Sequence, residues 1–191
     1  MNAYYLYFLL IGLSAGMIFS GCQDDPEATT GDEVREPYSN EESDAAQDFD
    51  KDQFIAEAAS DGVMEVQLAQ YVQQNTNNQA VMDFAEMLQT EHAAANDKLM
   101  ILAQEKNWEL PDAMLPKHAE IYNRISQLTG DELDSEYLDV MIEAHNTAVA
   151  KFQNAAAFTN DDALRKWVRE TMPHLERHLQ SAVELKQQGP G

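Results

Sequence analysis

Apolar residues recur at alternating intervals of three and four along four stretches of the chain between residues 52 and 187. This spacing places them on one face of an α-helix, and a helix with one apolar face must pack against other elements. We therefore predict long helices over about 52–74, 78–106, 134–157 and 161–187. No strand pattern interrupts these stretches, so the predicted fold class is all-α.

The connections between these stretches predict how the helices are joined. The two turns at about 75–78 and 159–162 are so short that each must join antiparallel neighbours. Residues 107–133 are long enough to cross the length of a bundle, and a short helix that begins at Pro116 and is closed by Gly130 fits within them. We expect a ferritin-like four-helix bundle in which this crossover joins the second and third helices. An up-down bundle with an irregular loop is the alternative.

The first 22 residues have the pattern of an export signal. The stretch from Leu6 to Phe19 is almost wholly apolar, which is the length of a signal-peptide core and short for a membrane span. It runs into Ser20-Gly21-Cys22 and so resembles the lipobox of bacterial lipoproteins, in which the cysteine is lipidated. The usual basic residues before the apolar core are missing. We predict a lipoprotein signal peptide over 1–22 with Cys22 as the lipidated residue; an ordinary signal peptide is the alternative.

Residues 23–50 are strongly acidic, with eleven acidic residues against the single Arg35. Such a segment buries too little apolar surface to offset its ordering entropy, so we predict a disordered linker before a helical domain over 51–188. The whole chain has a formal net charge of −22, which argues against nucleic acid as a partner. The predicted location is the bacterial envelope. We expect an outer-membrane lipoprotein, periplasmic or surface-exposed, held to the membrane by its lipid.

One ionisable residue lies in the middle of each predicted apolar face: Glu65, His92, His145 and His178. If they converge in the core, a carboxylate and three imidazoles form a ligand set suited to a transition metal whose identity the residues leave open. His174 and Glu91 are alternates, because His174 precedes His178 by one turn on the same face and Glu91 adjoins His92. The other interpretation is a hydrogen-bonded Glu/His layer without metal.

Three functions follow from these observations. The first is a binding module for a transition metal, and the second is a structural or interaction module with a metal-free polar layer. The third, an enzyme that uses the metal, has the least support, because it needs an open coordination position that sequence does not reveal. Neither a Gly-rich phosphate loop nor a nucleophile elbow is present, and the only cysteine lies in the signal.

Residues 52–186 resemble the bacterial domain of unknown function 4142 family, which is a ferritin-like helical bundle common in envelope proteins. The matching features are Glu65-Val66, Leu68-Ala69, Phe84-Ala85, Glu91-His92, Leu99, Gly130, Leu133-Asp134, Tyr137, His145, Pro173, Leu175 and His178-Leu179. Two departures are Glu91, where the family usually has Asp, and Leu133, where it often has Phe. The resemblance implies the fold and an envelope location, but no established activity.

Ferritin-like di-iron enzymes are a weaker match. They carry a Glu-x-x-His pair on each of two helices. Neither Glu91 nor Glu143 is followed by a histidine three residues later. A mononuclear site therefore fits these residues better than a di-iron centre.

Overall fold

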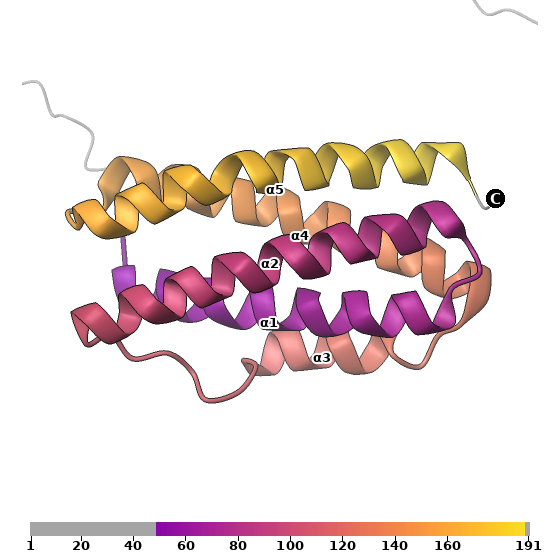
Figure 1. The fold of residues 1–191 in the computed structure, drawn as a ribbon, viewed down its shortest axis with the longest axis horizontal. Helices are drawn as coiled ribbons and strands as arrows, with labels where there is room; N and C mark the ends of the chain where they lie inside the picture. Colours follow the sequence, from indigo (N-terminus) through magenta and orange to yellow (C-terminus); the bar gives the residue numbers. More distant parts are fainter. Residues whose placement is uncertain (1–48, 190–191) are drawn as a thin grey trace, which may run out of the picture. The chain divides into compact units, whose positions relative to one another are not determined.

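The computed structural model describes residues 49–189, and this part of the chain contains five helices and no strand (Figure 1). The helices are α1 (Lys51–Asn75), α2 (Gln79–Lys106), α3 (Pro116–Ile125), α4 (Gly130–Phe158) and α5 (Asp162–Gln188). The all-α fold class is therefore confirmed. None of these helices is long and apolar enough to cross a membrane. The predicted signal peptide with Cys22, and the predicted linker up to residue 48, lie outside the described residues.

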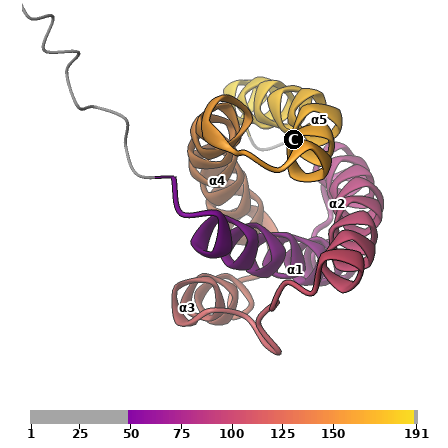
Figure 2. The same cartoon turned by 90° about the vertical axis from the view of Figure 1, so that its left-hand side faces the viewer.

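The four long helices pack side by side in the order α1, α2, α5, α4 around a common centre, and α3 lies outside them against α1 and α4 (Figure 2). Contacts at the two ends show that neighbouring helices run antiparallel. At one end the Tyr71 hydroxyl of α1 donates to the Leu128 carbonyl, just before α4 begins (3.0 Å). At the other end Lys106 of α2 pairs with Asp161, which caps α5 (3.1 Å).

The connection between α2 and α4 is held along α1 by buried polar contacts. The backbone N–H of Leu115 donates to Ser60 Oγ (2.7 Å), and the same hydroxyl lies 2.7 Å from Nδ1 of His118 on α3. Because Ser60 and His118 are both buried, these bonds are shielded from water and position α3 on the outer side of α1.

Two clusters of buried apolar side chains fill the space between the long helices. One includes Met64, Leu68, Leu88, Tyr137, Met141 and Ala182, and the other includes Phe54, Ile55, Leu99, Phe152, Trp167 and Leu175. Three of the four predicted site residues, His92, His145 and His178, fall where one cluster gives way to the other on α2, α4 and α5, and Glu65 lies within the first cluster on α1. Close packing on both sides fixes the backbones of these helices, and thereby fixes the height and direction of the polar side chains between the clusters.

The predicted boundary before α4 was wrong. The short helix ends at Ile125 and not at Gly130, and α4 begins at Gly130, whose φ of 60° suits a residue without Cβ. Leu133 and Tyr137 are fully buried, so the apolar face of α4 extends one turn further back than predicted. Asp134, where the sequence predicts this helix to begin, consequently lies inside the helix.

Candidate metal centre

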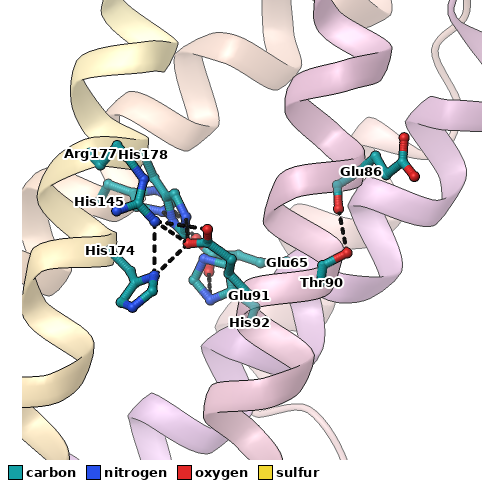
Figure 3. Close-up of polar contacts among 9 residues, drawn as sticks. All are labelled: Glu65, Glu86, Thr90, Glu91, His92, His145, His174, Arg177 and His178. Atoms are coloured by element: carbon teal, nitrogen blue, oxygen red, sulfur yellow. Dashed lines mark hydrogen bonds and ion pairs between the residues drawn. The ribbon is translucent and has the colours of Figure 1, made fainter.

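Three histidines from three helices meet in the core. His92 of α2, His145 of α4 and His178 of α5 are 6%, 0% and 1% exposed. Their ring centroids lie 5.1 to 5.4 Å apart, and one nitrogen from each ring lies within 4.8 Å of the other two. We call these three residues the histidine cluster (Figure 3). The side chains converge because each takes the position on its helix face that an apolar residue would otherwise fill.

Glu65 of α1 closes the cluster from the fourth side. Its Oε2 lies 2.9 Å from Nδ1 of His92, and its Oε1 lies 3.4 Å from Nδ1 of His145. The carboxyl group is almost fully buried, and this burial raises its pKa. Glu65 therefore contacts two rings through their Nδ1 atoms and leaves their Nε2 atoms for other partners.

The hydrogen on His145 can be assigned from its surroundings. Nδ1 of His145 lies 2.9 Å from the carbonyl oxygen of Met141, one turn earlier on α4. A carbonyl oxygen only accepts, so Nδ1 must carry the hydrogen and donate it. In the neutral ring the lone pair is then on Nε2.

The hydrogen on His178 can be assigned in the same way from its contact with Glu91. Partial burial raises the pKa of Glu91, but hydrogen bonds with His174 and His178 and the charge of Arg177 lower it to about 2. As an anion Glu91 only accepts, so Nε2 of His178, 2.8 Å from its Oε2, donates. The lone pair of neutral His178 is therefore on Nδ1. Arg177 holds both oxygens of Glu91, at 2.8 and 2.6 Å.

The lone pairs of the cluster face one another. Nε2 of His145 and Nδ1 of His178 are 3.2 Å apart, although neither carries a hydrogen in the neutral ring. Nε2 of His92 is buried and has no hydrogen-bond partner among the described residues. Burial lowers the pKa of all three rings to about 4, so they are neutral at pH 7. Such lone pairs repel unless a proton or a cation lies between them.

The donor set fits a transition metal. Three neutral imidazole nitrogens are common ligands of zinc, copper, cobalt, nickel and iron. In tetrahedral coordination at about 2.0–2.1 Å, two ligand nitrogens are about 3.3 Å apart. The 3.2 Å between Nε2 of His145 and Nδ1 of His178 is close to this value. A cation at this position would satisfy each lone pair that the protein leaves free.

The remaining sequence candidates lie around this set. His174 is 47% exposed, and its Nδ1 contacts Glu91 Oε2 at 2.6 Å on the solvent side of His178. Sequence reasoning missed that Glu91 and Arg177 form an ion pair across α2 and α5 beside the cluster. The adjacency of Glu91 to His92 was the available signal, but only the packing of α2 against α5 shows that Glu91 faces His178.

A cleft of about 150 Å³ between α2 and α5 reaches the cluster from outside. Its walls include His92 and His178 together with Glu91, His174 and Ala95. The cleft therefore connects the exposed His174 with two of the three buried rings.

The class of protein that this fold and site define is an all-helical domain with a buried histidine cluster between two apolar layers. The chain belongs to the family described as domain of unknown function DUF4142, whose family model matches residues 36–185. The resemblance inferred from the sequence is thus confirmed. No curated protein matches the chain.

Solved structures of DUF305 proteins share the fold. A DUF305 fragment from Deinococcus radiodurans superposes with a TM-score of 0.64 at 14% identity, covering 72% of this chain and 95% of that one. A DUF305 protein from Streptomyces coelicolor, described as a candidate secreted protein, gives a TM-score of 0.60 at 15% identity and covers 72% and 92%. At these identities the likeness shows the fold alone.

Proposed function

We propose that this protein is an envelope lipoprotein whose helical domain, a ferritin-like four-helix bundle, binds one transition-metal ion in its core. The ligands are Nε2 of His92, Nε2 of His145 and Nδ1 of His178. The observation that carries the proposal is the direction of the lone pairs: the hydrogens on His145 and His178 are held by acceptors outside the cluster, and the buried Nε2 of His92 has no hydrogen-bond partner among the described residues. Proteins commonly fix metal-binding imidazoles in this way.

The surrounding acceptors have distinct roles in this proposal. Glu65 accepts from Nδ1 of His92, the Met141 carbonyl accepts from Nδ1 of His145, and Glu91 accepts from Nε2 of His178. In the sequence-based hypothesis Glu65 is itself a ligand, with Glu91 and His174 as alternates. The contacts support an outer position for Glu65, where its charge offsets part of the charge of the metal. A bound metal would supply a Lewis-acid or redox centre.

A metal-free polar layer is the second candidate. It is favoured by the two contacts of Glu65, because a proton shared between Glu65 and His145 would form a buried ion pair without any metal. The domain would then act as a structural or interaction module. A measurement of metal content separates this candidate from the metal-binding one.

The experiment is the metal content of the purified protein after exposure to zinc or cobalt and removal of loosely bound ions. We expect one equivalent in the wild type and in His174→Ala, which is the matched control because His174 is exposed beside the cluster. The double variant His92→Ala/His145→Ala should hold none. A wild-type protein with well under one equivalent would support the metal-free layer, and metal retained by the double variant would contradict the assigned ligands.

The envelope location rests on the lipobox-like residues that end in Cys22 and on the acidic segment 23–50. The fold shared with a protein described as a candidate secreted protein agrees with export. We propose a lipid-anchored outer-membrane protein, periplasmic or surface-exposed, with residues 23–50 as tether. The test is the mass of the mature N-terminus, and an unmodified Cys22 would contradict the proposed lipid anchor.

A further inference from the structure

We infer that a metal in the histidine cluster keeps one open coordination position toward the cleft between α2 and α5, where it binds a small Lewis-basic ligand such as water, hydroxide or a small inorganic anion. This inference rests on the proposed metal site and adds the position and class of a further ligand. An open coordination position is what a metal-dependent activity would require, and the sequence could not reveal one.

The surrounding carboxylates are already engaged. Both oxygens of Glu65 face Nδ1 atoms of the rings, at 2.9 and 3.4 Å. Glu91 contacts the outer nitrogen of His178 and is held by Arg177. Neither carboxylate turns a free oxygen toward the cluster. Three protein ligands leave a fourth position in a tetrahedral site, as in zinc sites that bind water or substrate.

The packing around the cluster indicates where the open position lies. On the α1 side Glu65 covers the rings, and on the α4 side His145 is fully buried. The cleft between α2 and α5 is lined by two of the three ligands, His92 and His178, and extends to the exposed His174. The cleft is therefore the approach from solvent that reaches two of the ligands.

The size and charge of the cleft define the class of ligand. Its volume is about 150 Å³, and a water molecule occupies about 30 Å³ in the liquid, so several water-sized molecules fit beside the cluster. A divalent metal on three neutral imidazoles keeps its full positive charge and attracts anions. Lys98 and Glu170 both line the cleft, 3.9 Å apart, and offset each other's charge, so the attraction for an anion comes from the metal itself. A small anion or hydroxide therefore fits better than an organic substrate.

The test uses the cobalt(II)-loaded protein, whose visible spectrum reports the number and kind of ligands, with azide as the probe. We expect azide to change the spectrum of the wild type in a saturable titration. Ala95 lines the cleft and is half-buried, so Ala95→Leu should bind cobalt with unchanged stoichiometry but azide at least about tenfold more weakly. Ala119→Leu on α3 is the matched control, because Ala119 is also half-buried and lies away from the cleft. It should behave as the wild type. Should Ala95→Leu not fold, Ala94→Leu at the exposed wall of the cleft replaces it.

The outcomes separate this inference from the proposed function. Cobalt bound at one equivalent with a spectrum that azide leaves unchanged would overturn the open position and leave the metal site standing. An azide response equal in both leucine variants would overturn the assignment to the cleft. A protein that binds no cobalt would overturn the proposed function and this inference together.

Discussion

Glu65→Gln should change metal affinity and apo-protein stability in opposite directions. The amide keeps the size of the side chain and one acceptor, so it can still accept from Nδ1 of His92, which lies 2.9 Å from Oε2. His145 retains the Met141 carbonyl as its acceptor. The geometry of the ligands should therefore survive, and the loss is chiefly the negative charge beside the metal.

The expected magnitudes follow from the burial of Glu65. Loss of an outer-sphere carboxylate typically lowers metal affinity about 10–100-fold, which is about 1.4–2.7 kcal/mol. In the metal-free protein the substitution should be favourable instead. Burial raises the pKa of Glu65, so at pH 7 its ionised form opposes folding, and a neutral amide should raise the free energy of unfolding by about 1 kcal/mol.

Two measurements check this prediction. Zinc affinity is measured by competition with a chromophoric chelator, and the stability of the metal-free protein is measured by urea denaturation. Glu86→Gln on the exposed face of α2 is the control, and it should shift neither quantity by more than about 0.5 kcal/mol. Unchanged zinc affinity together with a less stable apo-protein would refute the reasoning, because Glu65 would then be a structural partner of the histidines only.

Three further predictions concern the rest of the site and the packing around it. Glu91→Gln should weaken zinc binding about 10–100-fold in the same competition assay, because the amide no longer forces Nε2 of His178 to carry the hydrogen; an affinity equal to that of the wild type would contradict the assigned tautomer. In urea denaturation of the apo-protein across pH, stability should fall from about pH 6.5 to 4, because burial lowers the pKa of the cluster histidines to about 4 and only the unfolded chain takes up their protons. Burial and the charge of Glu65 raise the pKa of Asp61 to about 8, so Asp61 makes stability fall as pH rises, and the maximum should lie near pH 6.5. Because three histidines outweigh one aspartate, a stability that does not fall between pH 6.5 and 4 would refute the histidine shifts. Gly62→Ala should destabilise the fold by about 1–3 kcal/mol in the same assay, because its Cβ would lie 2.2 Å from Oδ1 of Asn96; a neutral effect would mean that the Asn96 side chain moves aside freely.

The faces and heights of the site residues could be predicted from the sequence, because helical periodicity determines both. Glu65, His92, His145 and His178 interrupt apolar stripes, and all four are buried. The choice between His174 and His178 could not be made, since both lie on one face of the same helix. Burial of Leu175 and Ala182 sets the rotation of α5, which leaves His178 1% and His174 47% exposed on the side-chain scale.

The direction of each lone pair could not be predicted from the sequence either, but for a different reason. It depends on distances between helices, such as the 2.8 Å from Glu91 on α2 to His178 on α5, and periodicity within one helix carries no such information. The start of α4 at Gly130 escaped prediction because Asp134 resembles a helix cap, whereas the burial of Leu133 decided the boundary.

The cluster and Glu65 take one residue from each of four helices, and the last of these, His178, lies close to the C-terminal end of the domain. The complete site therefore does not exist in any piece of the chain that lacks one of these four helices. A protein exported unfolded could assemble it only after α5 had docked, and would draw its metal from the compartment where folding finishes. The ions available in that compartment, together with the affinity of the site, would then decide which metal the protein carries.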